Sequence, residues 1–181
     1  EGLIMRSGPT VGGTDSNCYW NEVHISTINT KRTFWLRNAS GGGNSGANSN
    51  YIYPLQVNLG ANANYVGYIE SQCSENNIHD LSGNGVVGTP GIALYINGQH
   101  NRVYESRTEA CTVGLKLGPG GTGCMFFGVD FLTFDFSDGV YPAYLMGADP
   151  SAQPICRPDQ IYQTNSQIPG LNNVITHMLF G

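Results

Sequence analysis

The chain of 181 residues has little charge, and this limits its partners. Only 12% of the residues are Asp, Glu, Lys or Arg, and the net charge at neutral pH is −5. The eight Lys and Arg residues are scattered, so they form no basic patch for nucleic acid or for an anionic membrane surface. The chain also lacks a run of about 18 apolar residues that would span a bilayer. The sequence therefore argues against nucleic-acid binding and against membrane insertion.

The cysteines and histidines show no metal-binding spacing. The five cysteines include no Cys-x-x-Cys pair and the four histidines are isolated, so we expect neither a metal site nor a cofactor. Cys73 and Cys111 follow Asn64 and Asn101 by nine and ten residues, which would place them at nearly equivalent positions of adjacent repeats. Two interpretations stay open, a disulfide or two buried thiols packed together, and the thiols are favoured.

What the chain does contain is Gly, Asn and a recurring apolar tetrad. It has 25 Gly and 18 Asn, which are typical of tight turns. The tetrad is a small residue followed by two bulky apolar residues that flank a variable position, and it is clearest at Gly91, Gly114 and Ala143, with looser copies at residues 2, 33 and 54. A second strand pattern begins ten residues after the first two of these, at Asn101 and Cys124, so two short strands repeat together at a spacing of 23 residues.

This repeat predicts an all-β fold, a right-handed parallel β-helix, because a unit too small to bury its own apolar face must bury it against the next copy. The tetrad starts are 21 to 37 residues apart. Such variation suits a β-helix with loops of different length better than leucine-rich or helical repeats. The longest interval contains an extra strand-like piece, Asn76 to Asp80, which predicts three sides for that turn. Asn76 and Asn101 precede strands, where asparagines can form hydrogen bonds along a stack.

The domain organisation follows from where this pattern stops. We expect the β-helix to cover residues 1–147 and a Pro-rich C-terminal extension, residues 148–181, to cap its open end or to mediate oligomerisation. The chain begins directly in a repeat, at Glu1-Gly2, without a signal-like segment. This favours a processed piece of a longer protein.

The tetrads, the Asn-x-Val strand at Asn101 and the variable turn lengths resemble the right-handed parallel β-helix superfamily over roughly residues 2–147. Its members include pectate-lyase-like enzymes and the trimeric tailspikes, fibres and other appendages of bacteriophages. The charge-poor, Asn- and Gly-rich composition is most similar to that of the viral appendages. The resemblance implies three parallel β-helices with outer grooves that bind host-surface glycans and in some members cleave them. No catalytic motif of the family matches a position here.

Paired carboxylates are the candidate groups if the chain cleaves polysaccharide. Hydrolysis needs two carboxyl groups about 5 to 9.5 Å apart. Glu105 follows the strand at Asn101 and Asp130 follows the equivalent strand one repeat later, so we expect the two to share an outer face. Solvated acids without a catalytic role are favoured over this interpretation, and no catalytic residue is assigned.

Outward aromatic residues are candidates for glycan binding or for a subunit interface. Trp35 and Tyr95 are expected to point outward, Arg37 lies two residues after Trp35, and Trp20 flanks a loop. A β-helix uses such residues either as a platform for sugars or to pack against another subunit. The interface is the favoured alternative.

Together these observations predict a structural and adhesive virion component. It would be a β-helical spike, fibre or capsid-decorating protein at the virion surface or in another extracellular place. It would form a homotrimer, contact other virion proteins and bind cell-surface polysaccharide. The main alternative is a polysaccharide-cleaving, pectate-lyase-like enzyme or a fragment of one, and a third is a secreted bacterial β-helix that binds glycan without cleaving it.

Overall fold

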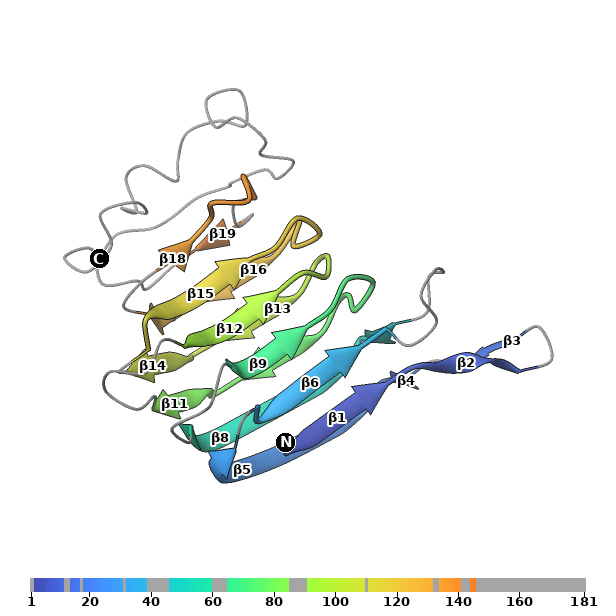
Figure 1. Cartoon of the computed structure of the whole chain (residues 1–181), viewed down its shortest axis with the longest axis horizontal. Coiled ribbons are helices and arrows are strands. Elements are labelled where there is room, and N and C mark those ends of the chain that lie inside the picture. The colour runs from blue at the N-terminus through green and yellow to red at the C-terminus, as the bar shows by residue number, and fades with distance from the viewer. Residues whose placement is uncertain are drawn as a thin grey trace.

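The computed structural model is an all-β solenoid whose strands stack in parallel from turn to turn (Figure 1). The structure describes residues 2–11, 14–16, 18–30, 32–38, 46–59, 65–84, 91–109, 111–131, 134–140 and 144–145. These ranges contain strands and no helix. The parallel β-helix predicted from the apolar repeat is therefore confirmed. The predicted boundary at residue 147 and the C-terminal extension lie outside the described residues and stay predictions.

One sheet runs the length of the stack and takes one strand from each turn (Figure 1). Its strands are β1 (Leu3–Arg6), β6 (Phe34–Arg37), β9 (Tyr65–Ile69), β12 (Ile92–Ile96), β15 (Val113–Leu117) and β18 (Phe134–Asp135). Neighbours pair in parallel. Because side chains alternate along a strand, every second residue points inward and stacks above its equivalent in the next turn. We call this the first sheet.

The second sheet forms the remaining sides of the coil. It begins with two long strands, β5 (Glu22–Thr30) and β8 (Tyr51–Leu59), which pair in parallel. Later turns replace the long strand by two short ones. One series is β10 (Asn77–His79), β13 (Arg102–Tyr104), β16 (Met125–Phe127) and β19 (Tyr144–Leu145), and the other is β11 (Ser82–Asn84), β14 (Arg107–Glu109) and β17 (Asp130–Phe131). The turn with strands β9, β10 and β11 thus has three sides, as its extra strand-like piece predicted.

Four short strands lie outside these two sheets. Strands β2 (Gly8–Val11) and β3 (Thr14–Ser16) form an antiparallel hairpin that projects away from the stack in Figure 1. Strands β4 (Cys18–Tyr19) and β7 (Ala47–Asn48) pair in parallel just before the second sheet begins. They align the chain at the corner that leads into that sheet.

The strand register corrects the predicted alignment of the tetrads. The tetrad pattern places Gly114 beside Gly91, but Leu94 pairs with Leu115, so Gly114 follows Ala93 and this turn is 21 residues long instead of 23. The error is a slip of two residues. Such a slip keeps every side chain on the same face of the sheet, so the apolar alternation does not distinguish the two registers.

Two further tetrads belong to the other sheet. The tetrad that starts at Pro54 lies in β8, where Pro54 pairs with Ile25, and Tyr144, next to Ala143, pairs with Met125. The apolar pattern is the same in both sheets, which is why it did not separate them. The second strand pattern was predicted correctly, because Arg102 pairs with Met125 at the expected spacing of 23 residues.

A column of left-handed residues turns the chain at the corner that enters the second sheet. The backbone angle φ lies between 55° and 69° at Trp20, Ser49, Glu75, His100 and Gly123. Each precedes the first residue of a second-sheet turn. A second left-handed column, at Asp80, Glu105 and Gly128, separates the two short strands of the later turns. These bends, repeated in register, give the solenoid its corners.

Four asparagines form a hydrogen-bonded ladder inside the first of these corners: Asn21, Asn50, Asn76 and Asn101. The side-chain Oδ1 of each later member accepts hydrogen bonds of 2.9–3.1 Å from the backbone N–H and from Nδ2 of the member before it. The Nδ2 of the last three also donates to a main-chain carbonyl of the preceding turn. Hydrogen bonding along the stack is thus confirmed for Asn76 and Asn101. Cys124 takes the next position in this asparagine ladder.

The core fills the space between the sheets with stacked apolar columns. In the first sheet one column contains Leu36, Ile69, Ile96 and Leu117, all fully buried. The neighbouring column includes Phe34, and its partner in the next turn is a glycine, Gly67. A Cβ atom at Gly67 would lie 2.2 Å from the Phe34 ring, so the glycine makes room for it.

The cysteines do not stack as one of the sequence interpretations required. Cys73 is buried in the turn between β9 and β10, whereas Cys111 is half-buried in the turn between β14 and β15. Both are free thiols. They lie at different corners, so both the disulfide and the packed pair of thiols were wrong. The counting that paired them assumed that Cys111 precedes a second-sheet strand, but it precedes a first-sheet strand.

Candidate functional site

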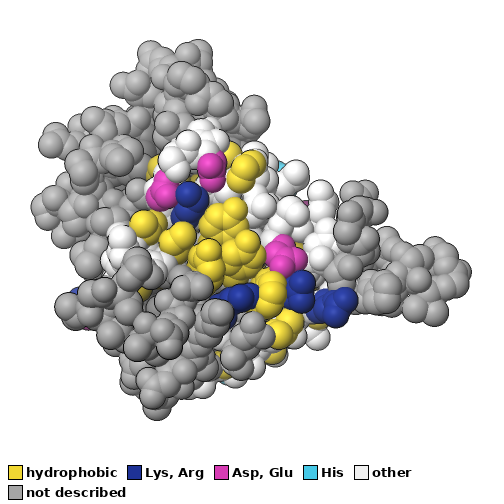
Figure 2. Space-filling model, viewed as in Figure 1, with side chains coloured by type: hydrophobic (Ala, Val, Ile, Leu, Met, Phe, Trp, Pro, Cys, Tyr) yellow, Lys and Arg dark blue, Asp and Glu magenta, His cyan; other side chains and the backbone are white. Residues whose placement is uncertain are grey.

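A strip of aromatic side chains crosses the outer face of the first sheet. Trp35, Tyr68 and Tyr95 occupy one register position on β6, β9 and β12 and point away from the core. Tyr65, at the start of β9, packs edge-on against Tyr68 with 4.8 Å between ring centroids. Figure 2 shows apolar side chains gathered over this sheet, with charged groups at both ends of the cluster. We call these four residues the outer strip.

Ionic groups fix one end of the outer strip. The guanidinium carbons of Arg32 and Arg37 lie 3.9 and 4.0 Å from the Trp35 ring centroid, within the range of cation–π contacts. The indole Nε1 of Trp35 donates to Glu70 Oε1 at 2.8 Å, and Arg37 Nε donates to the same oxygen at 3.3 Å. The ring is therefore held in one orientation.

The other end of the outer strip carries an ion pair. Lys116 and Asp135 continue the register of Tyr95, and Lys116 Nζ lies 2.9 Å from Asp135 Oδ2 and 3.9 Å from Asp138. Hydrogen bonds from the Ser137 hydroxyl and amide, together with Lys116, lower the pKa of Asp135 to about 2. This acid is therefore charged at neutral pH.

The rings of the outer strip mostly cover one another. Tyr68 and Tyr95 stack with centroids 4.9 Å apart and planes at 21°, and Trp35 meets Tyr68 edge-on at 6.1 Å. Partial burial raises the pKa of both tyrosines, so their hydroxyls stay protonated. The outer strip thus offers ring edges and hydroxyl groups more than open ring faces.

No family model, curated protein or solved structure matches the chain. What the structure supports of the predicted relationship is therefore the architecture, a parallel β-helix. The described ranges contain no helix long and apolar enough to cross a membrane. Within the same part of the chain, no group of three His, Cys, Asp or Glu side chains is placed to hold a metal ion.

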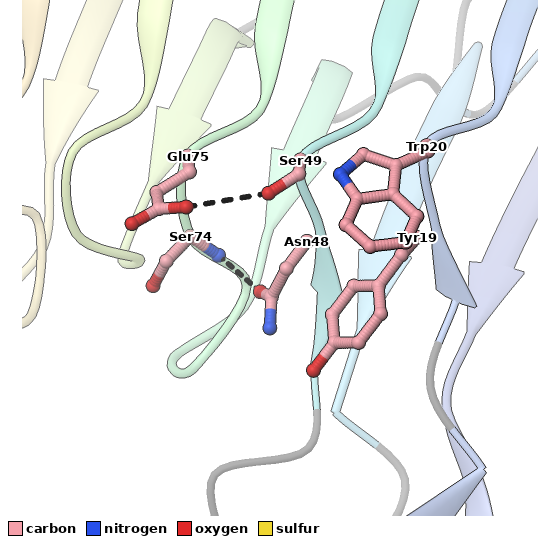
Figure 3. Close-up of a pocket in the computed structure, with 6 residues that line it drawn as sticks. All are labelled: Tyr19, Trp20, Asn48, Ser49, Ser74 and Glu75. Carbon is pink, nitrogen blue, oxygen red and sulfur yellow. Dashed lines mark hydrogen bonds between the residues drawn. The ribbon is translucent and has the colours of Figure 1, made fainter.

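The residues singled out in the sequence fall on two surfaces. Trp35, Arg37 and Tyr95 lie together on the first sheet. Trp20 lies apart at the corner that enters the second sheet, is 80% exposed and borders a pocket (Figure 3). A single role shared by all four residues is therefore not what their placement suggests.

The two carboxylate candidates sit at different levels of the register. Glu105 occupies the left-handed corner position beside Gly128 and is exposed, and its backbone N–H donates to Phe127 O. Asp130 pairs with Arg107 in the neighbouring turn. The register thus places a basic residue directly opposite Asp130, two residues along the chain from Glu105.

Sequence reasoning missed two features of the surface. Tyr68 completes the outer strip, but it was overlooked because the third tetrad was placed at Pro54. A second column of stacked rings lies on the outer face of the second sheet: His24, Tyr53, His79, Tyr104 and Phe127, with consecutive centroids 4.4–5.1 Å apart. Alignment of the second-sheet strands on their preceding asparagines is the signal that finds this column.

Proposed function

We propose that this protein is a structural and adhesive component of a virion surface, a β-helical spike, fibre or capsid-decorating protein. It assembles as a homotrimer, contacts other virion proteins and binds cell-surface polysaccharide. The observation that carries the proposal is the outer strip, a half-buried aromatic surface on an otherwise polar protein. The polar, charge-poor composition and the resemblance to viral appendages support the extracellular and adhesive parts.

The geometry of the outer strip favours a subunit interface over a sugar platform. Aromatic residues and arginine are enriched at protein–protein interfaces, and the strip combines both. Its rings are already packed against one another and against Arg32 and Arg37, so a sugar would find little open ring face. A neighbouring protein surface, in contrast, would bury the ring edges and accept hydrogen bonds from the tyrosine hydroxyls.

The experiment is the native mass by light scattering, for the wild type and for Trp35→Ala. We expect the wild type to have three times the mass of the monomer and the variant to dissociate. Tyr104→Ala is the matched control, because it removes a stacked ring from the other sheet and should remain trimeric. A monomeric wild type at micromolar concentration would overturn the assembly.

The role of the outer strip and the virion assignment have separate tests. Trp35→Ala should retain polysaccharide binding in a pull-down with capsule or cell-wall polysaccharide, since the proposal uses this residue for assembly. A trimer that loses binding would assign the strip to the glycan instead. For the virion assignment, antibodies against the protein should label purified virus particles, and unlabelled particles would contradict it.

A further inference from the structure

A pocket of about 220 Å³ opens at the corner where the chain enters the second sheet (Figure 3). It is lined by Tyr19, Trp20, Asn48, Ser49, Ser74 and Glu75. These residues are equivalent pairs from three successive turns, because Tyr19 pairs with Asn48 and the Ser74 amide donates to Asn48 Oδ1 at 2.5 Å. Short side chains in the middle turn thus leave a notch between two aromatic residues on one side and a serine and a carboxylate on the other.

The size of the notch follows from the strand spacing. Its two walls belong to turns separated by one intervening turn, so the backbones that carry them are about 9.6 Å apart, twice the spacing of neighbouring strands. This width admits one sugar ring and is too narrow for a second strand-bearing segment. The floor is the Asn48 and Ser49 pair.

Trp20 is an unusual choice for its position. Its φ is 56°, a left-handed angle that is a clear outlier for a bulky residue, and the equivalent position three turns later is Gly123. The corner can therefore be built without a side chain. Since Trp20 is also 80% exposed, its ring adds little to the core, and the strained position is retained for what the ring contacts outside the chain.

The polar groups of the pocket are held in place by the stack. Ser49 Oγ donates to Glu75 Oε2 at 3.3 Å, and the Glu75 N–H donates to Gln99 O at 3.0 Å. Asn21, directly after Trp20, donates through its backbone N–H and its Nδ2 to Asn50 in the asparagine ladder. The two walls are thus fixed before a ligand arrives, which lowers the entropy lost on binding.

We propose that this pocket binds a single pyranose residue, neutral or amino-substituted, of a polysaccharide. The apolar C–H face of the sugar packs on the Trp20 indole, and its hydroxyl groups donate to the Glu75 carboxylate and exchange hydrogen bonds with Asn48 and Ser74. A uronic or sialic acid is rejected, because its carboxylate would face Glu75 and none of the six lining residues is cationic. The inference rests on the polysaccharide binding of the proposed function and gives it a site.

The test uses the whole chain and a panel of methyl glycosides, followed by saturation-transfer NMR and titration calorimetry. The panel contains the methyl glycosides of glucose, galactose, mannose and glucosamine, with methyl glucuronide as the acidic probe. We expect at least one neutral or amino glycoside to bind and the glucuronide not to bind. Trp20→Gly should weaken the affinity at least about tenfold, because the apolar face of the sugar loses its partner.

Trp20→Gly also separates binding from folding. Glycine relieves the left-handed strain, so the urea unfolding midpoint should stay equal or rise while binding is lost. His100→Gly is the matched control, since it makes the same change at the same corner position outside the pocket and should bind as the wild type does. Glu75→Gln should admit methyl glucuronide. Failure of every glycoside to bind the wild type, or wild-type affinity in Trp20→Gly, would overturn the proposal.

The outcome is independent of the assembly proposed above. Trp20→Gly should leave the native mass unchanged in light scattering, because the pocket and the outer strip lie on different faces. A monomeric protein that still binds the glycosides through Trp20 would sink the trimer and retain the pocket. A trimer that binds none of them would do the reverse.

Discussion

Removal of one member of the asparagine ladder is the strongest test of how the stack is held together. Asn76 is fully buried, and its side chain takes part in four hydrogen bonds: two accepted from Asn50, one donated to Ala47 O and one donated to Asn101 Oδ1. Asn76→Ala removes all four and leaves several buried partners without a replacement. At about 1 kcal/mol for each bond, the free energy of unfolding should fall by about 4 kcal/mol.

The assay is urea unfolding followed by far-UV circular dichroism. For a denaturant dependence of about 2 kcal/mol per molar, the midpoint should move down by about 2 M. Asn77→Ala is the matched control, because this neighbouring, nearly buried side chain donates one hydrogen bond of 3.3 Å, to Glu75 O, and its loss should cost about 1 kcal/mol or less. A loss below about 1 kcal/mol in Asn76→Ala would refute the argument that the asparagine ladder stabilises the corner.

Three other perturbations probe the core and the surface. Thr108→Val should raise the free energy of unfolding by about 1 kcal/mol in urea titrations, because the buried Thr108 hydroxyl finds no hydrogen-bond partner among the described residues. Asp135→Asn should flatten the acid limb of stability by up to about 1 kcal/mol: a folded pKa of about 2, below the ordinary 3.8, stabilises the protein above about pH 4, and this contribution is lost as the pH falls towards 2. Maleimide should label Cys111 in the native protein but spare Cys73 and Cys124, since burial raises the pKa of both thiols to about 12.

Each of these has a clear opposite result. A less stable Thr108→Val would mean that the hydroxyl has a partner after all. Equal unfolding midpoints of wild type and Asp135→Asn at both pH 6 and pH 3 would remove the proposed titration. Peptide mass spectrometry that finds Cys73 or Cys124 labelled as fast as Cys111 would show that the turns open readily.

The fold could be predicted from the sequence because stacked turns repeat their inward pattern. The spacing between Asn101 and Cys124 was read correctly, since asparagine and the strand after it mark the register at a corner. The first sheet lacks such a marker. There the apolar alternation is unchanged by a slip of two residues, so Gly91 was aligned where Ala93 belongs.

The candidate site was only partly predictable for a related reason. Outward orientation follows from alternation along a strand, which is why Trp35 and Tyr95 were placed on an outer face. The pocket at Trp20 depends instead on which residues of three separate turns lie side by side. Loops of different length separate Tyr19, Asn48 and Ser74 in the sequence, and no local pattern records that they form one notch.

The asparagine ladder also makes the molecule resemble a one-dimensional lattice. Each turn is one lattice site, and the amide contacts at the corner couple it only to the sites directly before and after it. A turn at either end has half the coupling of a turn in the middle. Melting of such a chain proceeds inward from its ends, in steps of one turn, and the central turns around Asn50 and Asn76 are the last to separate.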